Sequence, residues 1–117
     1  MQEAMFYTQE ENNRVRCGLC RSRCLISDDG CGICNVRENH GGILYSRVYG
    51  KICAEHVDPI EKKPLFHFLP GSSSYSIASS GCNFRCRFCQ NYEISQIEQN
   101  APIPGDERSP RQIVQRA

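Results

Sequence analysis

The chain has 117 residues and a formal net charge of +1, and nine of its residues are cysteine. The near-neutral charge excludes the basic surface that is typical of nucleic-acid-binding proteins. No apolar run approaches the roughly 20 residues that a membrane-spanning helix needs. The polar N-terminal residues lack the apolar segment of a secretory signal peptide, so we expect a cytoplasmic protein. In that compartment an odd number of clustered cysteines indicates metal binding rather than disulfide bonds.

Residues 1–16 are polar, and residues 17–34 are rich in cysteine and in turn-forming glycine and aspartate. Glycine permits the tight turns through which thiolates converge, and a segment with so little apolar content needs a metal to fold. Its two Cys-x2-Cys pairs are typical of a four-cysteine zinc site. The symmetry of the pairs favours four ligands: Cys17, Cys20, Cys31 and Cys34. A second iron–sulfur cluster is the alternative, and Cys24 is a fifth thiol left over.

The middle of the chain predicts β-structure. Residues 43–57 carry β-branched and aromatic residues interrupted by Gly50, which favours a two-stranded hairpin or meander. Asp58-Pro59 ends this pattern, and residues 58–71 contain three prolines, which predicts an ordered, irregular connection.

Several side chains that bear reactive groups are isolated in the sequence. Cys53 stands alone within a strand pattern and is expected to be a small buried hydrophobic residue. The three histidines have no neighbouring partner in a catalytic pattern, and we assign no catalytic residue: His40, His56 and His67.

Residues 75–80 predict a short strand of small residues, and a cysteine loop follows Gly81 directly. A site at the carboxyl end of a parallel strand is where α/β barrels and open sheets place their chemistry. Further along the chain, Ser109 and Pro110 predict the N-cap and the first residue of a helix that runs toward residue 117.

The cysteine loop has the spacing Cys-x3-Cys-x2-Cys, formed by Cys82, Cys86 and Cys89. Structural zinc sites and ordinary ferredoxin clusters take four protein ligands. A [4Fe–4S] cluster held by three thiolates leaves one iron open for a substrate or cofactor. A zinc site completed by His56 or His67 is the alternative.

This loop resembles the signature of the radical S-adenosylmethionine (SAM) superfamily in its spacing, in Phe88 before the third cysteine, in Gly81 and in the preceding small-residue strand. Over residues 17–97 the chain is similar to the pyruvate formate-lyase-activating-enzyme-like proteins known as AmmeMemoRadiSam system radical SAM enzymes. The stretches DPIEKKPLFHFLPG and CQNYEISQ carry much of this similarity.

The resemblance implies an α/β fold. Residues 71–117 would form the first strand, cluster-binding loop and first helix of a radical SAM (β/α) barrel. Residues 1–70 would form a small cysteine-rich, β-containing N-terminal extension with a hairpin and a proline-rich connection. A full barrel needs about 200 residues or more, so we expect the N-terminal part of a longer, truncated enzyme, inactive by itself.

The resemblance also implies a reaction. A [4Fe–4S] cluster on the three loop cysteines would reductively cleave SAM to a 5′-deoxyadenosyl radical. That radical abstracts hydrogen from an unknown substrate, either a peptide glycine, as in glycyl-radical activases, or a small molecule. Phe88 would contact the adenine, and the partner would be a low-potential reductant of the flavodoxin or ferredoxin type. The competing functions are a non-enzymatic zinc-binding interaction module and an iron–sulfur electron carrier.

Overall fold

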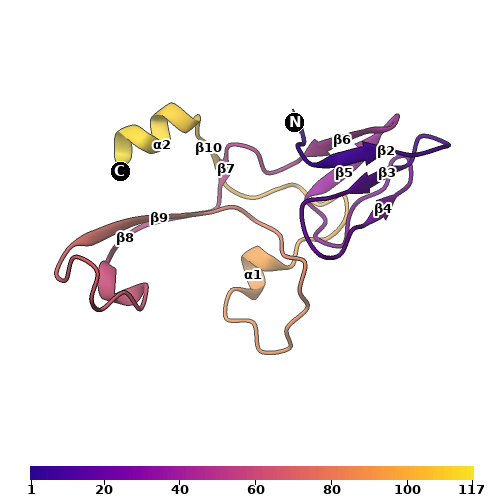
Figure 1. The fold of residues 1–117 in the computed structure, drawn as a ribbon. Coiled ribbons are helices and arrows are strands. Elements are labelled where there is room, and N and C mark those ends of the chain that lie inside the picture. Colours follow the sequence, from indigo (N-terminus) through magenta and orange to yellow (C-terminus); the bar gives the residue numbers. More distant parts are fainter.

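The computed structural model describes residues 1–117 and consists mainly of four small antiparallel sheets. Helical structure is limited to one 3-10 turn and two short α-helices. The molecule is elongated, with extents of 54 × 34 × 25 Å. Figure 1 shows the N-terminal sheets at one end and a long hairpin at the other. The expected α/β fold that starts a radical SAM barrel is therefore wrong, because every strand pairs antiparallel and no strand-helix-strand unit forms.

Two three-stranded sheets form the N-terminal end of the molecule. One has the order β1-β6-β5, and the other has the order β2-β3-β4. The bounds of these strands are β1 Gln2–Glu3, β2 Tyr7–Gln9, β3 Val15–Cys17, β4 Leu25–Ile26, β5 Arg37–His40 and β6 Ile43–Ser46. Between β5 and β6 the register pairs His40 with Ile43, so the chain reverses through a two-residue turn. Gly41 and Gly42 have φ values of +62° and +83°, which the hairpin turn requires and glycine adopts readily.

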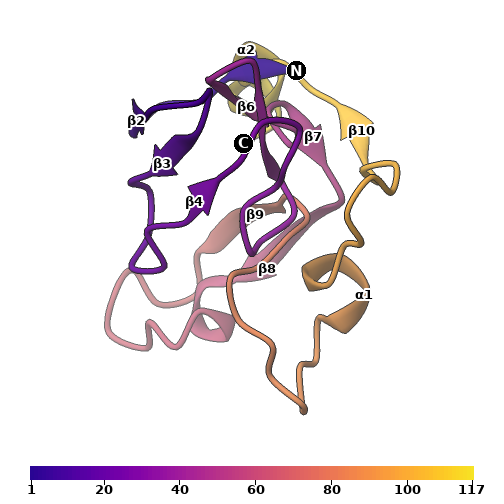
Figure 2. The ribbon, with the colours of Figure 1, turned by 90° about the vertical axis from the view of Figure 1, so that its right-hand side faces the viewer.

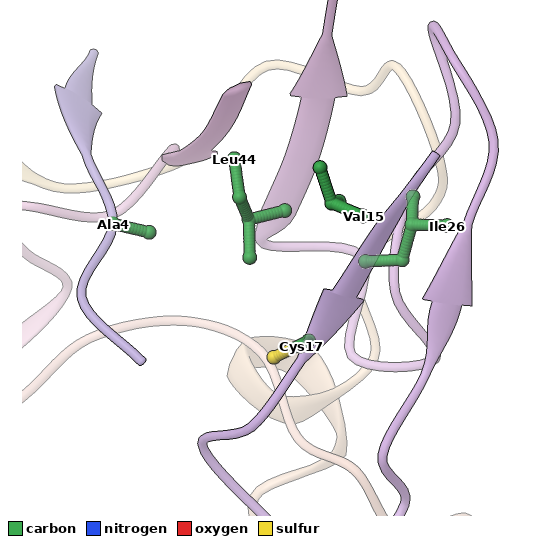
Figure 3. Close-up of a cluster of buried hydrophobic side chains, with 5 residues drawn as sticks. All are labelled: Ala4, Val15, Cys17, Ile26 and Leu44. Carbon is green, nitrogen blue, oxygen red and sulfur yellow. The ribbon is translucent and has the colours of Figure 1, made fainter. Parts of the chain in front are cut away.

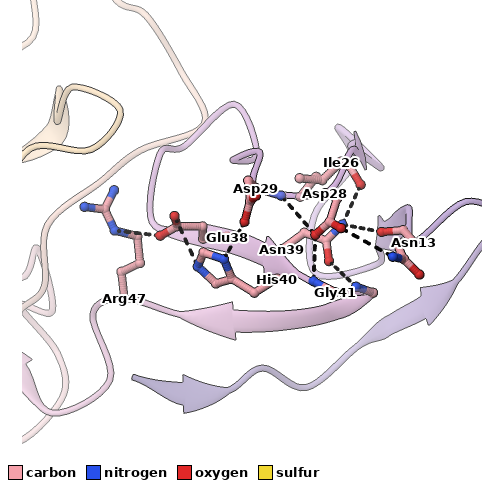
Figure 4. Close-up of polar contacts among 10 residues, drawn as sticks. Asn13, Ile26, Asp28, Asp29, Glu38, Asn39, His40, Gly41 and Arg47 are labelled. Atoms are coloured by element: carbon pink, nitrogen blue, oxygen red, sulfur yellow. Dashed lines mark hydrogen bonds and ion pairs between the residues drawn. The ribbon is translucent and has the colours of Figure 1, made fainter.

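The hydrophobic core lies between these two sheets. Its five buried residues are Ala4, Val15, Cys17, Ile26 and Leu44 (Figure 3). A polar residue is buried beside them: the side-chain amide of Asn39 donates to the carbonyls of Asn13 at 2.7 Å and Ile26 at 3.1 Å (Figure 4). Because its hydrogen bonds are satisfied, the buried amide ties the β5–β6 hairpin to the second sheet without a desolvation penalty. So small a core leaves most of the chain without extensive apolar burial.

The other end of the molecule is an antiparallel hairpin of β8 Ala54–Pro59 and β9 Ser73–Ala78. The 3-10 turn η1 Ile60–Lys62 follows β8, and an irregular stretch leads back to β9, as the prolines of residues 58–71 predict. Seen from the end that carries the N-terminal sheets, this hairpin lies behind them (Figure 2). The expected strand at residues 75–80 exists as β9, but it does not begin a parallel sheet, since its partner is the strand directly before it.

Four short elements complete the fold. Strand β7 Lys51–Ile52 pairs with β10 Asp106–Glu107, and helix α1 Tyr92–Ser95 follows the cysteine loop. Helix α2 Pro110–Arg116 begins as expected, with Ser109 as its N-cap. The Ser109 hydroxyl accepts from the Gln112 amide at 3.3 Å, and the Gln112 side chain accepts from the Ser109 amide at 2.8 Å, which completes a capping box.

The expected hairpin or meander within residues 43–57 is wrong, because no two strands of this range pair with each other. Strand β6 pairs upstream with β5, while β8 pairs downstream with β9. The two-residue turn at Gly41 and Gly42 brings β5 next to β6, so β6 pairs with β5 and not with the residues after Gly50. No helix of the structure has both the length and the apolar character needed to cross a membrane.

Asp58 stabilises the loop end of the β8–β9 hairpin, where it pairs with Ser74. Its carboxylate is 8% exposed and accepts from Lys62 Nζ at 2.7 Å and Lys63 Nζ at 2.9 Å. The hydroxyl of Ser76 on β9 also donates to it, at 3.3 Å. The hydrogen bonds from the two lysines hold the pKa of Asp58 well below its ordinary range.

Because of the Asp58 carboxylate, we expect the free energy of unfolding to decrease at low pH. A lowered folded-state pKa means that the unfolded chain binds the proton first, so the stabilisation is complete above the ordinary pKa of about 3.9 and is lost as the pH falls below it. The measurement is the urea midpoint at about pH 6 and about pH 3. Asp58→Asn should lower the midpoint at the higher pH and reduce the difference between the two. The exposed Asp106→Asn is the control, and an acid dependence in Asp58→Asn equal to that of the wild type would contradict this role.

Candidate metal centre

The three cysteines of the Cys-x3-Cys-x2-Cys motif lie on one loop between β9 and α1. Its base is closed where the amide of Gly81 donates to the carbonyl of Ile94 at 2.8 Å. Cys86 is exposed, Cys82 and Cys89 are partly buried, and no disulfide bond involves any of them. All three thiols are therefore free to bind a metal.

Hydrogen bonds within the loop reach two of these sulfurs. The hydroxyl of Ser95 lies 3.3 Å from Cys89 Sγ, and the amide of Phe84 donates to Cys82 Sγ at 3.4 Å. The side chain of Gln96, just after α1, donates to the carbonyl of Phe84 at 3.1 Å. Helix α1 and the residue after it therefore support the loop from its C-terminal side.

Phe88, directly before the third cysteine, is 88% exposed. A ring that served to pack over the loop would be largely covered. Because the side chain of Phe88 is largely uncovered, its ring is available to a planar ligand.

A cavity of about 820 Å³ lies between the N-terminal residues, the cysteine-rich segment and the start of the loop. Its lining is mainly apolar and includes Ala4, Phe6, Leu19, Ile33 and Val36. Five cysteines from both parts of the chain also line it: Cys17, Cys20, Cys24, Cys34 and Cys82. The fold thus brings the two groups of cysteines that are separate in the sequence to one cavity.

Close contacts join the cysteine-rich segment to the loop. Gly81 has a φ of +97°, and a Cβ placed on it would stand 2.5 Å from Val36 Cγ1. The side chain of Arg85 donates to the carbonyl of Ile33 at 3.5 Å. The first turn of the loop therefore packs directly against the turn that carries Cys34.

The thiols of the N-terminal group differ in their electrostatic surroundings. Hydrogen bonds from the backbone and side chain of Ser22 lower the pKa of Cys20, and the side chain of Asn83 adds to this effect from the loop. Burial raises the pKa of Cys31, and the nearby carboxylate of Glu38 raises it further. Cys20 is therefore the better thiolate of the two.

Three of the four predicted N-terminal ligands line the cavity, and Cys31 does not. Cys31 forms an isolated antiparallel bridge with Glu38 and does not line the cavity. Cys24, which the symmetry of the Cys-x2-Cys pairs leaves over, lines the cavity with Cys17, Cys20 and Cys34. The Cys20-x3-Cys24 spacing matches that of Cys82 and Cys86, and it is the sequence signal that places Cys24 with the other candidate ligands.

The remaining candidates lie apart from the cavity. Cys53 is partly buried at the start of the long hairpin, where its thiol donates to the carbonyl of Ala78 at 3.4 Å. His40 contacts the carboxylates of Asp29 at 3.0 Å and Glu38 at 3.2 Å (Figure 4). Neither His56 nor His67 lines the cavity.

In this arrangement no group of three or more His, Cys, Asp or Glu side chains stands close enough together to hold a metal ion. The thiols share a cavity and a loop without being at coordination distance. The donor chemistry suits a thiophilic metal, because free thiols are the ligands that zinc and iron–sulfur clusters prefer. Binding would have to draw the sulfurs together, as is common where metal binding is coupled to local folding.

Two proteins from Methanocaldococcus jannaschii are similar in sequence to this chain. "Uncharacterized protein MJ0808" is 50% identical over 115 residues, which cover 98% of this chain and 34% of the relative. "Uncharacterized protein MJ0674" is 32% identical over 89 residues, which cover 75% of this chain and 21% of the relative. No family model and no solved structure matches the chain. The chain therefore spans about a third of the length of one relative and about a fifth of the other.

Proposed function

We propose that this chain is the cluster-binding part of a radical SAM enzyme of the activating-enzyme-like type, with Cys82, Cys86 and Cys89 as the ligands of a [4Fe–4S] cluster. The observation that carries the proposal is the set of three free thiols at Cys-x3-Cys-x2-Cys spacing on one loop, with the exposed ring of Phe88 beside the third. The site of action would be the cytoplasm.

The donor set fits this cluster better than it fits a closed site. A ferredoxin-type cluster or structural zinc needs a fourth protein ligand, whereas the loop itself carries three thiols. The further cysteines that line the cavity with Cys82 belong to the N-terminal segment. Three thiolates leave one iron open, and the amino and carboxylate groups of SAM would occupy it. When bound, the cluster supplies the electron that cleaves SAM to the 5′-deoxyadenosyl radical, which abstracts hydrogen from the substrate.

Residues of this chain would hold the cluster and help to set its reduction potential. The Ser95 hydroxyl, 3.3 Å from Cys89 Sγ, and the Phe84 amide, 3.4 Å from Cys82 Sγ, would hydrogen-bond to ligating sulfurs. Such bonds help to set a cluster's reduction potential. The ring of Phe88 would stack on the adenine. The electron would come from a low-potential flavodoxin or ferredoxin, and the substrate is a peptide glycine or a small molecule.

The experiment is electron paramagnetic resonance of the anaerobically reconstituted, dithionite-reduced protein, with and without SAM. We expect a reduced [4Fe–4S] signal that shifts when SAM is added, because SAM binds the open iron. In Phe88→Ala the signal should persist, but the SAM concentration for a half-maximal shift should rise about 5- to 150-fold, since stacking on a base contributes about 1–3 kcal/mol.

Phe84→Ala is the matched control, because Phe84 is on the same loop and is also exposed. Its SAM response should equal that of the wild type. A protein that binds zinc stoichiometrically and gives no cluster signal after reconstitution would rule out the proposed enzyme and leave a zinc-binding module. A cluster signal that SAM leaves unchanged would instead favour an electron carrier.

A further inference from the structure

We propose that Cys17, Cys20, Cys24 and Cys34 bind a single zinc ion in the cavity, and that Cys31 takes no part. The four ligands are different residues from the three loop cysteines, although Cys82 lines the same cavity. The inference therefore goes beyond the proposed function and does not rest on it.

The first argument is placement. Of the five cysteines between residues 17 and 34, four line the cavity and Cys31 does not. The four come from three short segments that already contact one another. The amide of Cys17 donates to the carbonyl of Cys24 at 2.9 Å. A Cβ placed on Gly32 would stand 3.8 Å from Cys24 Sγ, so the segment that leads to Cys34 lies directly against Cys24.

The second argument is a buried charge. The side chain of Arg37 is only 6% exposed, and its guanidinium forms no salt bridge with a carboxylate. Its guanidinium donates to Cys17 Sγ at 3.3 Å and to the carbonyl of Met5. A buried cation without a counter-charge is costly. Four thiolates around one Zn²⁺ carry net negative charge and would supply that counter-charge beside Arg37.

The third argument is a hydroxyl without a partner. Ser80 also lines the cavity, it is 3% exposed, and its Oγ has no hydrogen-bond partner. Buried hydroxyl groups are nearly always hydrogen-bonded. A metal-bound thiolate accepts hydrogen bonds, so a zinc site in this cavity would give the Ser80 hydroxyl an acceptor.

Cys31 is excluded by its own surroundings. It is paired with Glu38 across a β-bridge, and Glu38 in turn contacts Arg47 at 3.4 Å and His40 at 3.2 Å (Figure 4). These groups form a polar cluster outside the cavity.

Zinc suits the site because a structural zinc ion takes four thiolates in a closed tetrahedral shell. The core of this end of the chain has only five buried residues, one of which is Cys17. Domains with so little core commonly use a metal as a substitute. The residues between Cys17 and Cys24 lie in turns and bends rather than in strands, and there the thiols could close on the ion.

The test uses the full chain with the loop cysteines replaced by serine, so that it is independent of any cluster there: Cys82→Ser, Cys86→Ser and Cys89→Ser. In this background we expect one zinc per chain. Adding Cys24→Ser should abolish stoichiometric zinc, while adding Cys31→Ser should retain it. With Co²⁺ as the probe, the sulfur-to-cobalt charge-transfer absorption should be the same in the background and in Cys31→Ser.

Loss of folding could mimic loss of a ligand, so Cys24→His provides a second variant. Histidine can replace a thiolate at zinc, and we expect this variant to bind one Co²⁺ with weaker charge-transfer absorption, as three thiolates require. Three results would overturn the inference: zinc retained in Cys24→Ser, zinc lost in Cys31→Ser, or an iron–sulfur cluster instead of zinc in the triple-serine background.

Discussion

Replacement of Cys86 by serine should reduce the iron content of the reconstituted protein from about four atoms per chain to nearly none. Three thiolates are the smallest set that holds the proposed cluster, and serine is a much poorer ligand for iron. Cys86 is exposed, so the substitution should leave the fold intact. Iron and sulfide analysis, together with the visible absorption of the cluster, measures the outcome.

Cys53→Ser is the control for this experiment. Cys53 is a partly buried free thiol whose hydrogen bond to the carbonyl of Ala78 a serine hydroxyl can also donate. This variant should bind as much iron as the wild type. Full iron content in Cys86→Ser, with the cluster absorption unchanged, would show that the cluster does not use this cysteine, and the proposed ligand set would be wrong.

Gly81→Ala should destabilise the junction between the two cysteine groups. Gly81 has a φ of +97°, and a Cβ there would lie 2.5 Å from Val36 Cγ1 and 3.1 Å from the carbonyl oxygen of Cys34. Strain at such a backbone conformation costs about 1–3 kcal/mol, and forcing an extra carbon into a packed contact costs about 1–3 kcal/mol more. Urea denaturation would measure the free energy of unfolding.

Gly71→Ala separates these two contributions. Gly71 has a φ of +80°, and a Cβ on it would meet nothing within 4 Å, so this variant carries the backbone strain without the contact. We expect Gly81→Ala to be less stable than Gly71→Ala by about 1–3 kcal/mol. The double variant Gly81→Ala, Val36→Ala should recover part of that difference, because the side chain in the way is shortened. Equal stability of the two glycine variants would mean that the loop does not pack against Val36.

The features predicted correctly depend on residues close together in the sequence. The capping box of α2 needs only Ser109, Pro110 and Gln112, which interact within one helical turn. The irregular connection after Asp58 follows from its prolines. The positions of β6, β8 and β9 were also approximately predicted, because their β-branched and small residues favour extended backbone.

The pairing of those strands could not be predicted in the same way. A run of residues that favours extended backbone does not specify which other strand it will pair with. Residues 75–80 were expected to start a parallel sheet, yet β9 pairs along its whole length with β8. Antiparallel pairing can use a nearby strand, whereas parallel pairing needs a crossover connection and further strands. Within these 117 residues β8 is the partner that β9 meets.

The amino-acid sequence by itself determined which side chains can bind metal and how three of them are spaced, because donor chemistry and loop length are local properties. Only the tertiary structure decided that Cys24 rather than Cys31 shares a cavity with Cys17, Cys20 and Cys34. It also placed the buried Arg37 beside Cys17. These relations depend on contacts between segments that are distant along the chain, and the direction of each side chain follows from strand pairing that no local pattern specifies.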